Sequence, residues 1–305
     1  MKIGKTVHDM PELTLHAASI VKAVMEHDRR VLLFGPMGVG KSTLAAQLAK
    51  VLSELQRTCC CLNADPGSPA FGVPGSVSTA VWRDASWQVT NIAALCTLDA
   101  GRFRLPLVSA ARMLAQQLPS GMVLIDAPGV VRGVSGRELL QGLVEATAVD
   151  AILALTAAGR PPPLLEELRA LPPDVFVVNA AVEAKRPGKR TRARQRTRQW
   201  DACLASATGQ TLDLAGLNVT GTPPLPAESS AWAGKQLALL RADRTLAMGE
   251  ALHIENDRLM VVLTAEAGDA DTLLIRDAAR SIDGYLETAK PYAAERLDYL
   301  PPNDV

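Results

Sequence analysis

Short apolar runs alternate with segments of helical periodicity through the first 180 residues. Runs of four or five mostly apolar residues predict buried strands at 31–34, 59–63, 122–126, 151–155 and 175–178. Apolar residues at helical spacing predict helices at 13–26, 43–55, 107–118, 139–146 and 164–170. Two further short strands are expected at 80–82 and 87–94. Alternating strands and helices predict an α/β fold with a mostly parallel sheet flanked by helices.

The pattern changes after residue 208. A proline-rich stretch at 222–226 predicts a domain boundary, and short strands follow at 236–240, 245–254, 258–263 and 272–275. Turn residues separate these strands, which is typical of a small β-rich module. We therefore expect an N-terminal helix in 1–28, a central domain in 29–221, and a small C-terminal β-rich domain in 222–305, with a loosely attached tail from 285.

A dense basic run occupies residues 185–198. It holds eight Lys or Arg in fourteen positions and no acid. Such a run can be a solvated helix, but so many like charges repel one another unless an anion offsets them. We therefore expect an anion-binding segment, with no apolar face left for a core. Its basic residues are Lys185, Arg186, Lys189, Arg190, Arg192, Arg194, Arg196 and Arg198.

The turn after the first central strand carries candidate chemistry. Gly-Pro-Met-Gly-Val-Gly-Lys-Ser at 35–42 fits the phosphate-binding pattern G-x-x-x-x-G-K-[ST], between a predicted strand and a predicted helix. Backbone N–H groups and a helix N-terminus then converge on one point, which favours a polyphosphate. We expect nucleotide contacts from Gly35, Pro36, Met37, Gly38, Val39, Gly40, Lys41, Ser42 and Thr43.

Two acids end predicted strands. Asp126 closes an apolar strand in the manner of a Walker B residue, and Asp65 follows the strand that we expect next to the phosphate loop. In this chemistry the loop lysine reaches the β and γ phosphates, and the serine hydroxyl helps to hold Mg²⁺. The predicted metal ligands are therefore Ser42, Asp65 and Asp126, and Lys41 is the predicted phosphate contact.

Composition narrows the class of protein. Hydrophobic residues make up 48% and charged residues 21% of 305, as in an ordinary globular chain, and the formal net charge is zero. Any attraction for nucleic acid must therefore be local, and 4% aromatic residues leave few groups for base stacking. Three adjacent cysteines alternate in direction on a strand, so we expect buried thiols instead of a zinc site. Without a signal peptide or a membrane span, we expect a cytoplasmic location.

Three segments together resemble a known family. They are the phosphate loop, Asp-Pro-Gly-Ser-Pro at 65–69 followed by Val-Pro-Gly at 73–75, and Ile-Asp-Ala-Pro-Gly-Val-Val-Arg-Gly at 125–133. The family is that of the polynucleotide 5′-hydroxyl kinases of the pre-mRNA cleavage complex and of ribosomal-RNA processing. The resemblance spans roughly 30–280. It places the family's mobile lid at 185–200 and its small β-domain at 234–275.

The resemblance implies transfer of the γ-phosphoryl group of ATP, with Mg²⁺, to the 5′-hydroxyl of single-stranded RNA or DNA. Lys41, the acid Asp65, and the lid residues Arg190 and Arg194 match catalytic positions. Substrate contacts are expected from Arg192, Arg196, Arg102 and Arg104. The chain departs from the family at Ser68 in place of Gln, at Asp126 in place of Asn, and at Val130 in place of Trp. Loss of a stacking platform costs about 1–3 kcal/mol per base.

Two alternatives stay open at this point. Residues 65–69 also resemble a stretch of the GTPases that assist cobalamin mutases, and Asp-Ala-Pro-Gly at 126–129 fits their switch pattern. A guanine site needs Asn-Lys-x-Asp, of which the chain has only Asn179. The other alternative is a member of an RNA-processing complex that binds ATP without catalysis. The sequence identifies no protein partner.

Overall fold

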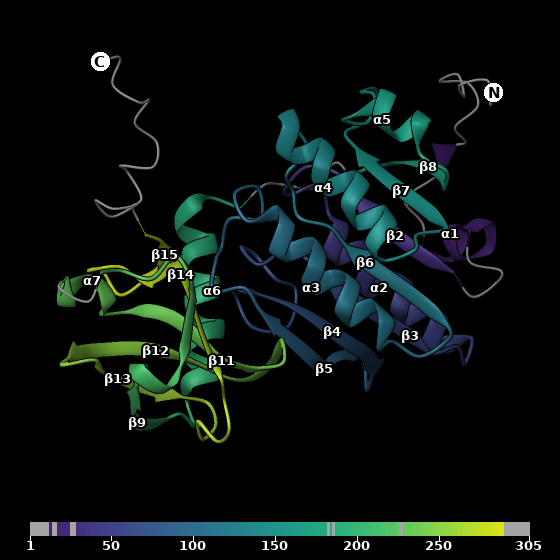
Figure 1. Ribbon diagram of the computed structural model, residues 1–305. Helices are drawn as coiled ribbons and strands as arrows, with labels where there is room; N and C mark the ends of the chain where they lie inside the picture. Colours follow the sequence, from purple (N-terminus) through teal and green to yellow (C-terminus); the bar gives the residue numbers. More distant parts are fainter. Residues whose placement is uncertain are drawn as a thin grey trace, which may run out of the picture. The chain divides into compact units, whose positions relative to one another are not determined.

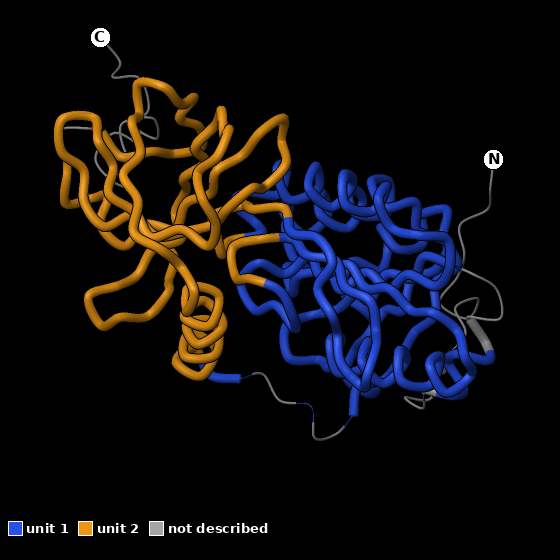
Figure 2. The backbone as a smooth tube through the Cα atoms, turned by 90° about the horizontal axis from the view of Figure 1, so that it is seen from below, with its two compact units in different colours: residues 1–72, 77–92, 100–188 blue, residues 73–76, 93–99, 189–305 orange. Residues whose placement is uncertain are grey.

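The computed structural model describes residues 12–13, 17–24, 29–181, 184, 187–225 and 228–289. The chain divides into two compact units (Figure 2). Unit 1 comprises residues 1–72, 77–92 and 100–188, and unit 2 comprises 73–76, 93–99 and 189–305. Parts of the predicted N-terminal helix, at 14–16 and 25–28, lie outside the described residues.

Unit 1 is built on an eight-stranded sheet with the order β1-β8-β7-β2-β6-β3-β4-β5 (Figure 1). Every neighbouring pair from β1 to β3 is parallel, and β4 runs antiparallel to β3. The mostly parallel α/β sheet predicted from the sequence is confirmed. The strands are β1 (Glu12–Leu13), β2 (Arg30–Phe34), β3 (Cys59–Asn63), β4 (Ser76–Arg83), β5 (Ser86–Ala94), β6 (Met122–Asp126), β7 (Ala151–Thr156) and β8 (Asp174–Asn179).

Helices cover both faces of this sheet, which is why β3 and β6 are buried along their whole length. Val31 and Leu33 of β2 share a core cluster with residues of the first two helices. Leu32 and Phe34, which alternate with them, lie beside Leu139 and Leu143 on the other face. The helices are α1 (Ala17–Val24), α2 (Lys41–Glu54), α3 (Arg104–Gln116), α4 (Gly133–Ala146) and α5 (Leu165–Ala170).

Unit 2 contains a continuous seven-stranded β-sheet, as the sequence predicted for the C-terminal part. Its strand order is β10-β14-β11-β12-β13-β9, and β15 also pairs with β14. The β11–β12 and β12–β13 hairpins each have a two-residue loop, and tight turns of this kind fix the register of the paired strands. The loop residues all have positive φ, as such turns require: Ala242, Asp243, Asn256 and Asp257. The elements are α6 (Lys189–Leu204), β9 (Thr208–Asp213), β10 (Asn218–Gly221), α7 (Ser229–Trp232), β11 (Lys235–Arg241), β12 (Arg244–Glu255), β13 (Arg258–Leu263), β14 (Thr272–Arg280) and β15 (Leu286–Thr288).

The units divide the chain differently from the expected boundary at 222. Unit 2 begins at 189 and also takes in the short segments 73–76 and 93–99. Backbone groups explain their place: Leu95 and Cys96 donate to Gly75 O, and Ala278 donates to Cys96 O at 3.0 Å. Gln236 Nε2 donates to Pro74 O at 2.8 Å. Such contacts between distant segments leave no periodic signal in the sequence.

The predicted loose tail is wrong at its beginning. Residues Leu286–Thr288 form β15, and the Leu286 side chain is completely buried. The rest of that tail, from 290, lies outside the described residues. All four cysteines of β3 and the 93–99 segment are free and buried, as expected for packing thiols. Within the described residues, no helix is long and apolar enough to span a membrane.

Gly75 offers a test of how the 73–76 segment is held. Its φ is +79°, and an added Cβ would collide with the side chain of Gln236, which is fully buried. Gly75→Ala should therefore destabilise the protein by about 1–3 kcal/mol, seen as a lower denaturant midpoint. Gly209→Ala is the matched control, since a Cβ there meets nothing within 4 Å. Equal midpoints for the two variants would contradict this packing.

Candidate nucleotide-binding site

The loop at residues 35–40 joins β2, in the middle of the sheet, to α2. Gly38 and Gly40 have φ of +83° and +97°, values that glycine adopts at little cost. Gly40 is the N-cap of α2, and it has no side chain that could cap the first helical turn. The N–H groups at this helix end are therefore directed into the loop, where an anion can accept from them.

Neighbouring strands hold the loop closely. A Cβ on Gly35 would lie 2.5 Å from Leu155 O at the end of β7, and a Cβ on Gly129 would lie 2.7 Å from Met37 N. Only glycine allows both approaches. Gly129 follows β6, so the segment after Asp126 positions the backbone of the phosphate loop. This role of Gly129 was not predicted from the sequence, although the Pro-Gly after an acidic strand end is a signal for it.

Lys41 is 7% exposed at the start of α2. Its ammonium donates to Gly35 O at 2.9 Å and to Pro36 O at 3.2 Å. The side chain therefore bends back over the loop, and its charge lies at the loop opening. This is the place that the sequence predicted for a phosphate contact.

Ser42 and Asp126 meet at the carboxyl end of the sheet. Ser42 Oγ donates to Asp126 Oδ2 at 2.6 Å. Asp126 is only 2% exposed, and its Oδ1 is buried without a hydrogen-bond partner. A buried acceptor of this kind is rare, because its desolvation is not offset. Its presence beside a serine hydroxyl fits the oxygen ligands that Mg²⁺ takes.

Burial raises the pKa of Asp126 to about 6. The positive charge of Lys41 and the hydrogen bond from Ser42 act in the opposite direction, and the negative charge of Asp65 adds to the increase. Desolvation is therefore the largest cause of the shift, as expected for a carboxylate without a full counter-charge. The sequence indicated the position of this acid but not its buried, unsatisfied state.

Asp65 lies one strand further from the loop than expected. The strand order is β2-β6-β3, so β6 with Asp126, and not β3, is the neighbour of β2. The expectation that Asp65 follows the strand next to the loop is wrong, because β6 is inserted between them by a crossover. Asp65 Oδ1 accepts the N–H groups of Gly67 at 3.0 Å and Ser68 at 3.1 Å, which orients the carboxylate in its own turn.

Asn63, whose role was not predicted from the sequence, supports that turn. It is fully buried at the end of β3. Its Nδ2 donates to Phe71 O at 3.0 Å, and its Oδ1 accepts from Asp65 N at 3.2 Å. A polar residue that ends a wholly apolar strand was the available signal. Asn63 therefore holds both ends of the loop that carries Asp65.

The two arginines predicted near the substrate have contacts of their own within unit 1. Arg104 forms an ion pair with Glu138 of α4, and its Nη1 donates to Gly101 O at 3.1 Å. The Arg102 guanidinium lies 5.0 Å from the centre of the Phe103 ring. These contacts account for both side chains in the structure, and a substrate role for Arg102 and Arg104 stays a prediction.

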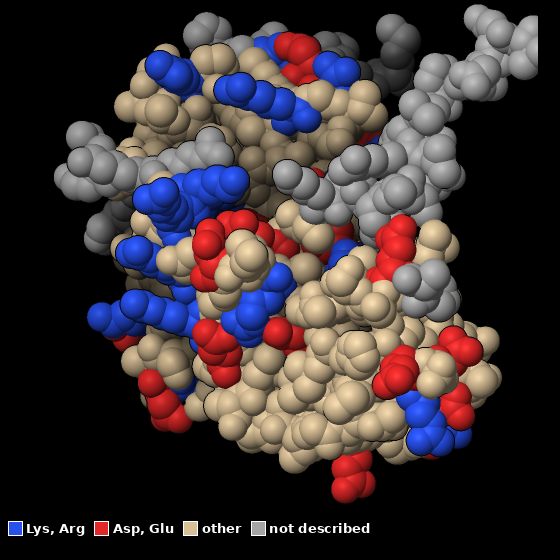
Figure 3. Space-filling model, turned by 90° about the vertical axis from the view of Figure 1, so that its left-hand side faces the viewer, with Lys and Arg blue, Asp and Glu red and all other residues tan. Residues whose placement is uncertain are grey.

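The basic run forms α6, which belongs to unit 2. The expectation that it has no apolar face is wrong: Ala193, Thr197 and Trp200 are buried at positions i, i+4 and i+7. Three positions suffice for a narrow packing stripe, and Trp200 lies just beyond the basic run at 185–198. Lys185 and Arg186 lie outside the described residues. Figure 3 shows Lys and Arg side chains gathered on one side of the face it displays.

A polar network fastens α6 to the sheet of unit 2. Trp200 Nε1 donates to Glu250 Oε2 at 3.0 Å, and Arg280 binds both Glu250 and Asp201. The Leu286 amide donates to Thr197 Oγ1 at 2.9 Å. The helix is therefore a fixed part of unit 2, packed on β15.

The predicted lid arginines differ in their surroundings. Arg196 Nε donates to Leu286 O at 2.6 Å, and Arg194 Nε donates to Tyr285 Oη at 3.4 Å. Arg192 is half-buried, whereas Arg190 is exposed. Arg196 therefore has a structural contact on the sheet side of the helix, and Arg190 and Arg194 lie on the solvent side.

Comparison with known proteins agrees with this arrangement. Residues 35–95 match the family of the mRNA cleavage and polyadenylation factor CLP1 P-loop. No curated protein sequence matches the chain. The structure is similar to that of wild-type Clp1p in complex with Pcf11p, with a TM-score of 0.69 and 14% identity over 85% of this chain and 76% of that one.

A second Clp1p structure, described by its extended interface with Pcf11p and by ATP loss in a point mutant, gives a TM-score of 0.67. It has 14% identity over 86% of this chain and 77% of the other. At this identity the two structures establish likeness of fold, while the family match covers the phosphate loop and the Asp65 turn themselves. Residues 35–95 therefore match the Clp1 P-loop family, in agreement with the sequence resemblance, and the fold of the chain is similar to that of Clp1p.

Proposed function

We propose that this protein is an ATP-dependent kinase that phosphorylates the 5′-hydroxyl end of a single-stranded nucleic acid. The observation that carries the proposal is the pair formed by Ser42 and Asp126, with a buried and unsatisfied Asp126 oxygen beside the phosphate loop. A loop that only binds an anion has no use for such a carboxylate. A phosphoryl-transfer site uses it, because a divalent cation must neutralise charge on the phosphates.

Ser42 and Asp126 are the residues that would hold Mg²⁺. The ion supplies charge neutralisation on the β and γ phosphate oxygens when it is bound. Asp126 would contribute a carboxylate that is ionised at neutral pH, since its pKa is about 6. Ser42 would contribute its hydroxyl oxygen, which now donates its proton to that carboxylate.

The phosphate loop would bind the triphosphate through backbone N–H groups and Lys41. In the structure the Lys41 ammonium is bonded to two loop carbonyls. On nucleotide binding it would exchange these neutral acceptors for phosphate oxygens, and hydrogen bonds to charged acceptors are the stronger ones. This exchange needs only rotation of the lysine side chain, because the loop backbone is already held by Gly35 and Gly129.

Asp65 is the proposed general base for the attacking hydroxyl. An alcohol must lose its proton as it attacks, and a positioned carboxylate that accepts it contributes about 10²–10⁴-fold in rate. The amides of Gly67 and Ser68 fix the orientation of the Asp65 side chain, and Asn63 fixes its backbone. Arg190 and Arg194 are exposed on α6 of unit 2, and their catalytic role stays a prediction.

A second candidate function is that of an ATP-binding protein of an RNA-processing complex that does not transfer phosphate. The two Clp1p structures are complexes with a protein, Pcf11p, and one concerns ATP loss. A protein partner for this chain is proposed on that likeness. Val130 stands where the kinase family has a stacking aromatic residue and is half-buried, which also favours this candidate. Transfer of labelled γ-phosphate to a 5′-hydroxyl oligonucleotide distinguishes the two.

Lys41→Ala should abolish nucleotide binding, because it removes the ammonium that lies at the loop. We expect at least a 100-fold weaker affinity for Mg²⁺-ATP in calorimetry. Lys50→Ala is the matched control, since Lys50 lies exposed further along α2 and should bind ATP normally. Equal ATP affinity in the two variants would refute the phosphate-loop assignment.

Asp65→Asn should keep ATP affinity and lose transfer by about 10²–10⁴-fold, because the amide still accepts from the turn but does not take a proton at neutral pH. The measurement is transfer of labelled γ-phosphate to 5′-hydroxyl RNA and DNA, with ATP and GTP as donors. Asp84→Asn, in the exposed turn between β4 and β5, is the control. Absence of transfer by the unaltered protein, with ATP still bound, would favour the second candidate function.

Asp126→Asn should separate stability from function. The folded pKa of Asp126 lies above its ordinary value, so the metal-free protein binds more protons than its unfolded chain between pH 3.8 and about 6. Its stability therefore falls as pH rises through this range, by about 3 kcal/mol for a shift of this size. The variant removes the buried charge and should be more stable at pH 7.5, with no gain at pH 4.

The same variant should bind ATP without the usual enhancement by Mg²⁺. In the unaltered protein, Mg²⁺-dependent affinity should decline as pH falls through about 6, where Asp126 becomes protonated. Thermal unfolding in chelator-containing buffer measures the change in stability, and calorimetry measures the Mg²⁺-dependent affinity for ATP. A variant that is less stable at pH 7.5 and still responds to Mg²⁺ would rule out the buried charge and the metal site together.

A further inference from the structure

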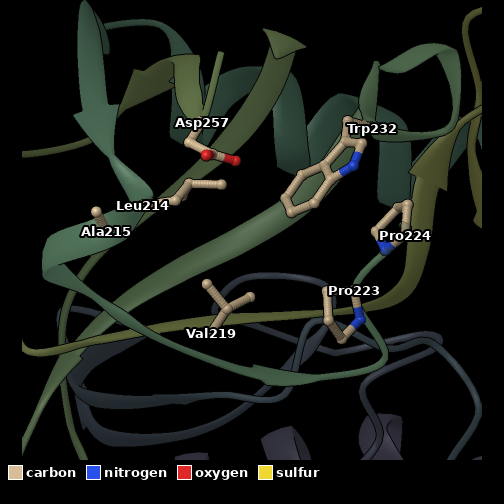
Figure 4. A pocket seen from close by; sticks show the side chains of 7 residues that line it. All are labelled: Leu214, Ala215, Val219, Pro223, Pro224, Trp232 and Asp257. Atoms are coloured by element: carbon tan, nitrogen blue, oxygen red, sulfur yellow. The ribbon is translucent and has the colours of Figure 1, made fainter. Parts of the chain in front are cut away.

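Unit 2 contains a pocket that takes no part in the proposed chemistry. It has a volume of about 330 Å³, which suits one aromatic side chain or a pair of aliphatic ones. In Figure 4 the side chains of Trp232, Leu214 and Val219 surround the space, with two prolines on one side. Six of the lining residues are apolar and one is acidic: Leu214, Ala215, Val219, Pro223, Pro224, Trp232 and Asp257.

The walls are preformed. Trp232 is 1% exposed and its Nε1 donates to Leu225 O at 3.2 Å, which fixes the indole plane. Leu214 N donates to Asp257 O at 3.0 Å, so the β12–β13 hairpin holds the opposite wall. Binding in this pocket therefore does not require its walls to become ordered first. Most of the favourable free energy of binding would come from burying apolar surface.

The pocket lies where the sheet of unit 2 is open. β9 and β10 are the two ends of the strand order, and residues 214–217 join them directly. All four residues of β10 are exposed, and Val219 at the pocket rim is 36% exposed. Natural proteins usually cover such an edge with another segment. The question is which segment covers this one.

The course of the chain at the end of the described part answers it. β10 and β15 both pair with the same edge of β14, β10 opposite Thr272–Ile275 and β15 opposite Ala278–Arg280. Thr222 N donates to Ile275 O at 2.8 Å, and Ala289 N donates to Asp277 O at 2.6 Å. These two acceptors are two residues apart, or roughly 6.6 Å along a strand.

The directions of the strands then bring the chain end to the pocket. β10 runs parallel to β14 and β15 antiparallel, so β15 itself runs toward the end of β10. Pro223 and Pro224, which line the pocket, follow immediately after Thr222. Sixteen residues follow Ala289 in the sequence, and they reach up to about 50 Å when extended. The pocket is therefore within reach of residues 290–305.

We propose that residues 290–305 dock in this pocket and cover the edge of β10. The segment carries aromatic and aliphatic side chains suited to the apolar walls, namely Tyr292, Leu297, Tyr299 and Leu300. Arg296, next to Leu297, supplies a positive charge for the Asp257 carboxylate at the rim. Because the segment is tethered, its effective concentration is of millimolar order, so a modest affinity suffices for docking.

The test compares the full chain with a chain that ends at Ala289. The indole N–H signal of Trp232, assigned with Trp232→Phe, and the methyl signals of Val219 report on the pocket in NMR spectra. We expect both to shift on deletion, and a synthetic peptide of residues 290–305 to restore them with saturation below about 1 mM. Unchanged amide signals in β15 show that the deletion leaves the strand in place.

Variants of the full chain keep the test independent of the deletion. Val219→Asp should mimic the deletion at Trp232, whereas Thr220→Asp, on the next residue of the same exposed strand, should not. Replacing Tyr292, Leu297, Tyr299 and Leu300 together by Ser should also mimic it. Signals that stay unchanged in the shortened chain would overturn the proposal. Shifts that depend on protein concentration would overturn it too, in favour of a second copy as the occupant.

Discussion

The structure of unit 1 depends on how a single carboxylate is buried. Asp126 ends the central strand β6, has almost no contact with solvent, and satisfies only one of its oxygens through Ser42. Burying such a group is unfavourable, so the surrounding sheet must provide the compensating stability. It does so with strands that are buried on both faces and with a glycine loop held between the ends of β7 and β6. The stability that offsets the buried carboxylate therefore comes from the surrounding sheet and loop, and not from the site.

Much of unit 1 could be predicted from the sequence because its signals are local. An apolar run of five residues between turn residues can hardly be other than a buried strand, and the phosphate-loop pattern implies the strand before it and the helix after it. Strand order is a different matter. β6 lies between β2 and β3 because of the crossover connections that pack best, and the residues around Asp65 give no sequence signal for this order.

Unit 2 was less predictable from the sequence, because several of its elements give only weak local signals. Its hairpins were found because paired polar residues at the turns mark them, but β9, β10 and β15 are short and mostly exposed or isolated in the sequence. The contribution of segments 73–76 and 93–99 could not be foreseen, since each is held by backbone acceptors and not by a side-chain pattern. The packing stripe of α6 was hidden because eight charges outweigh three small or aromatic residues in any average over the helix.

The dependence of α6 on β15 has a consequence for biosynthesis. The helix is complete once residue 204 has been added, but the strand that accepts its Thr197 and Arg196 contacts comes more than eighty residues later. Until β15 is added, Thr197 and Arg196 lack these partners, and Trp200 can bind only Glu250 of β12. A message truncated before codon 286 would therefore yield a chain whose most basic helix lacks the contacts of Thr197 and Arg196 with Leu286 and is held less firmly.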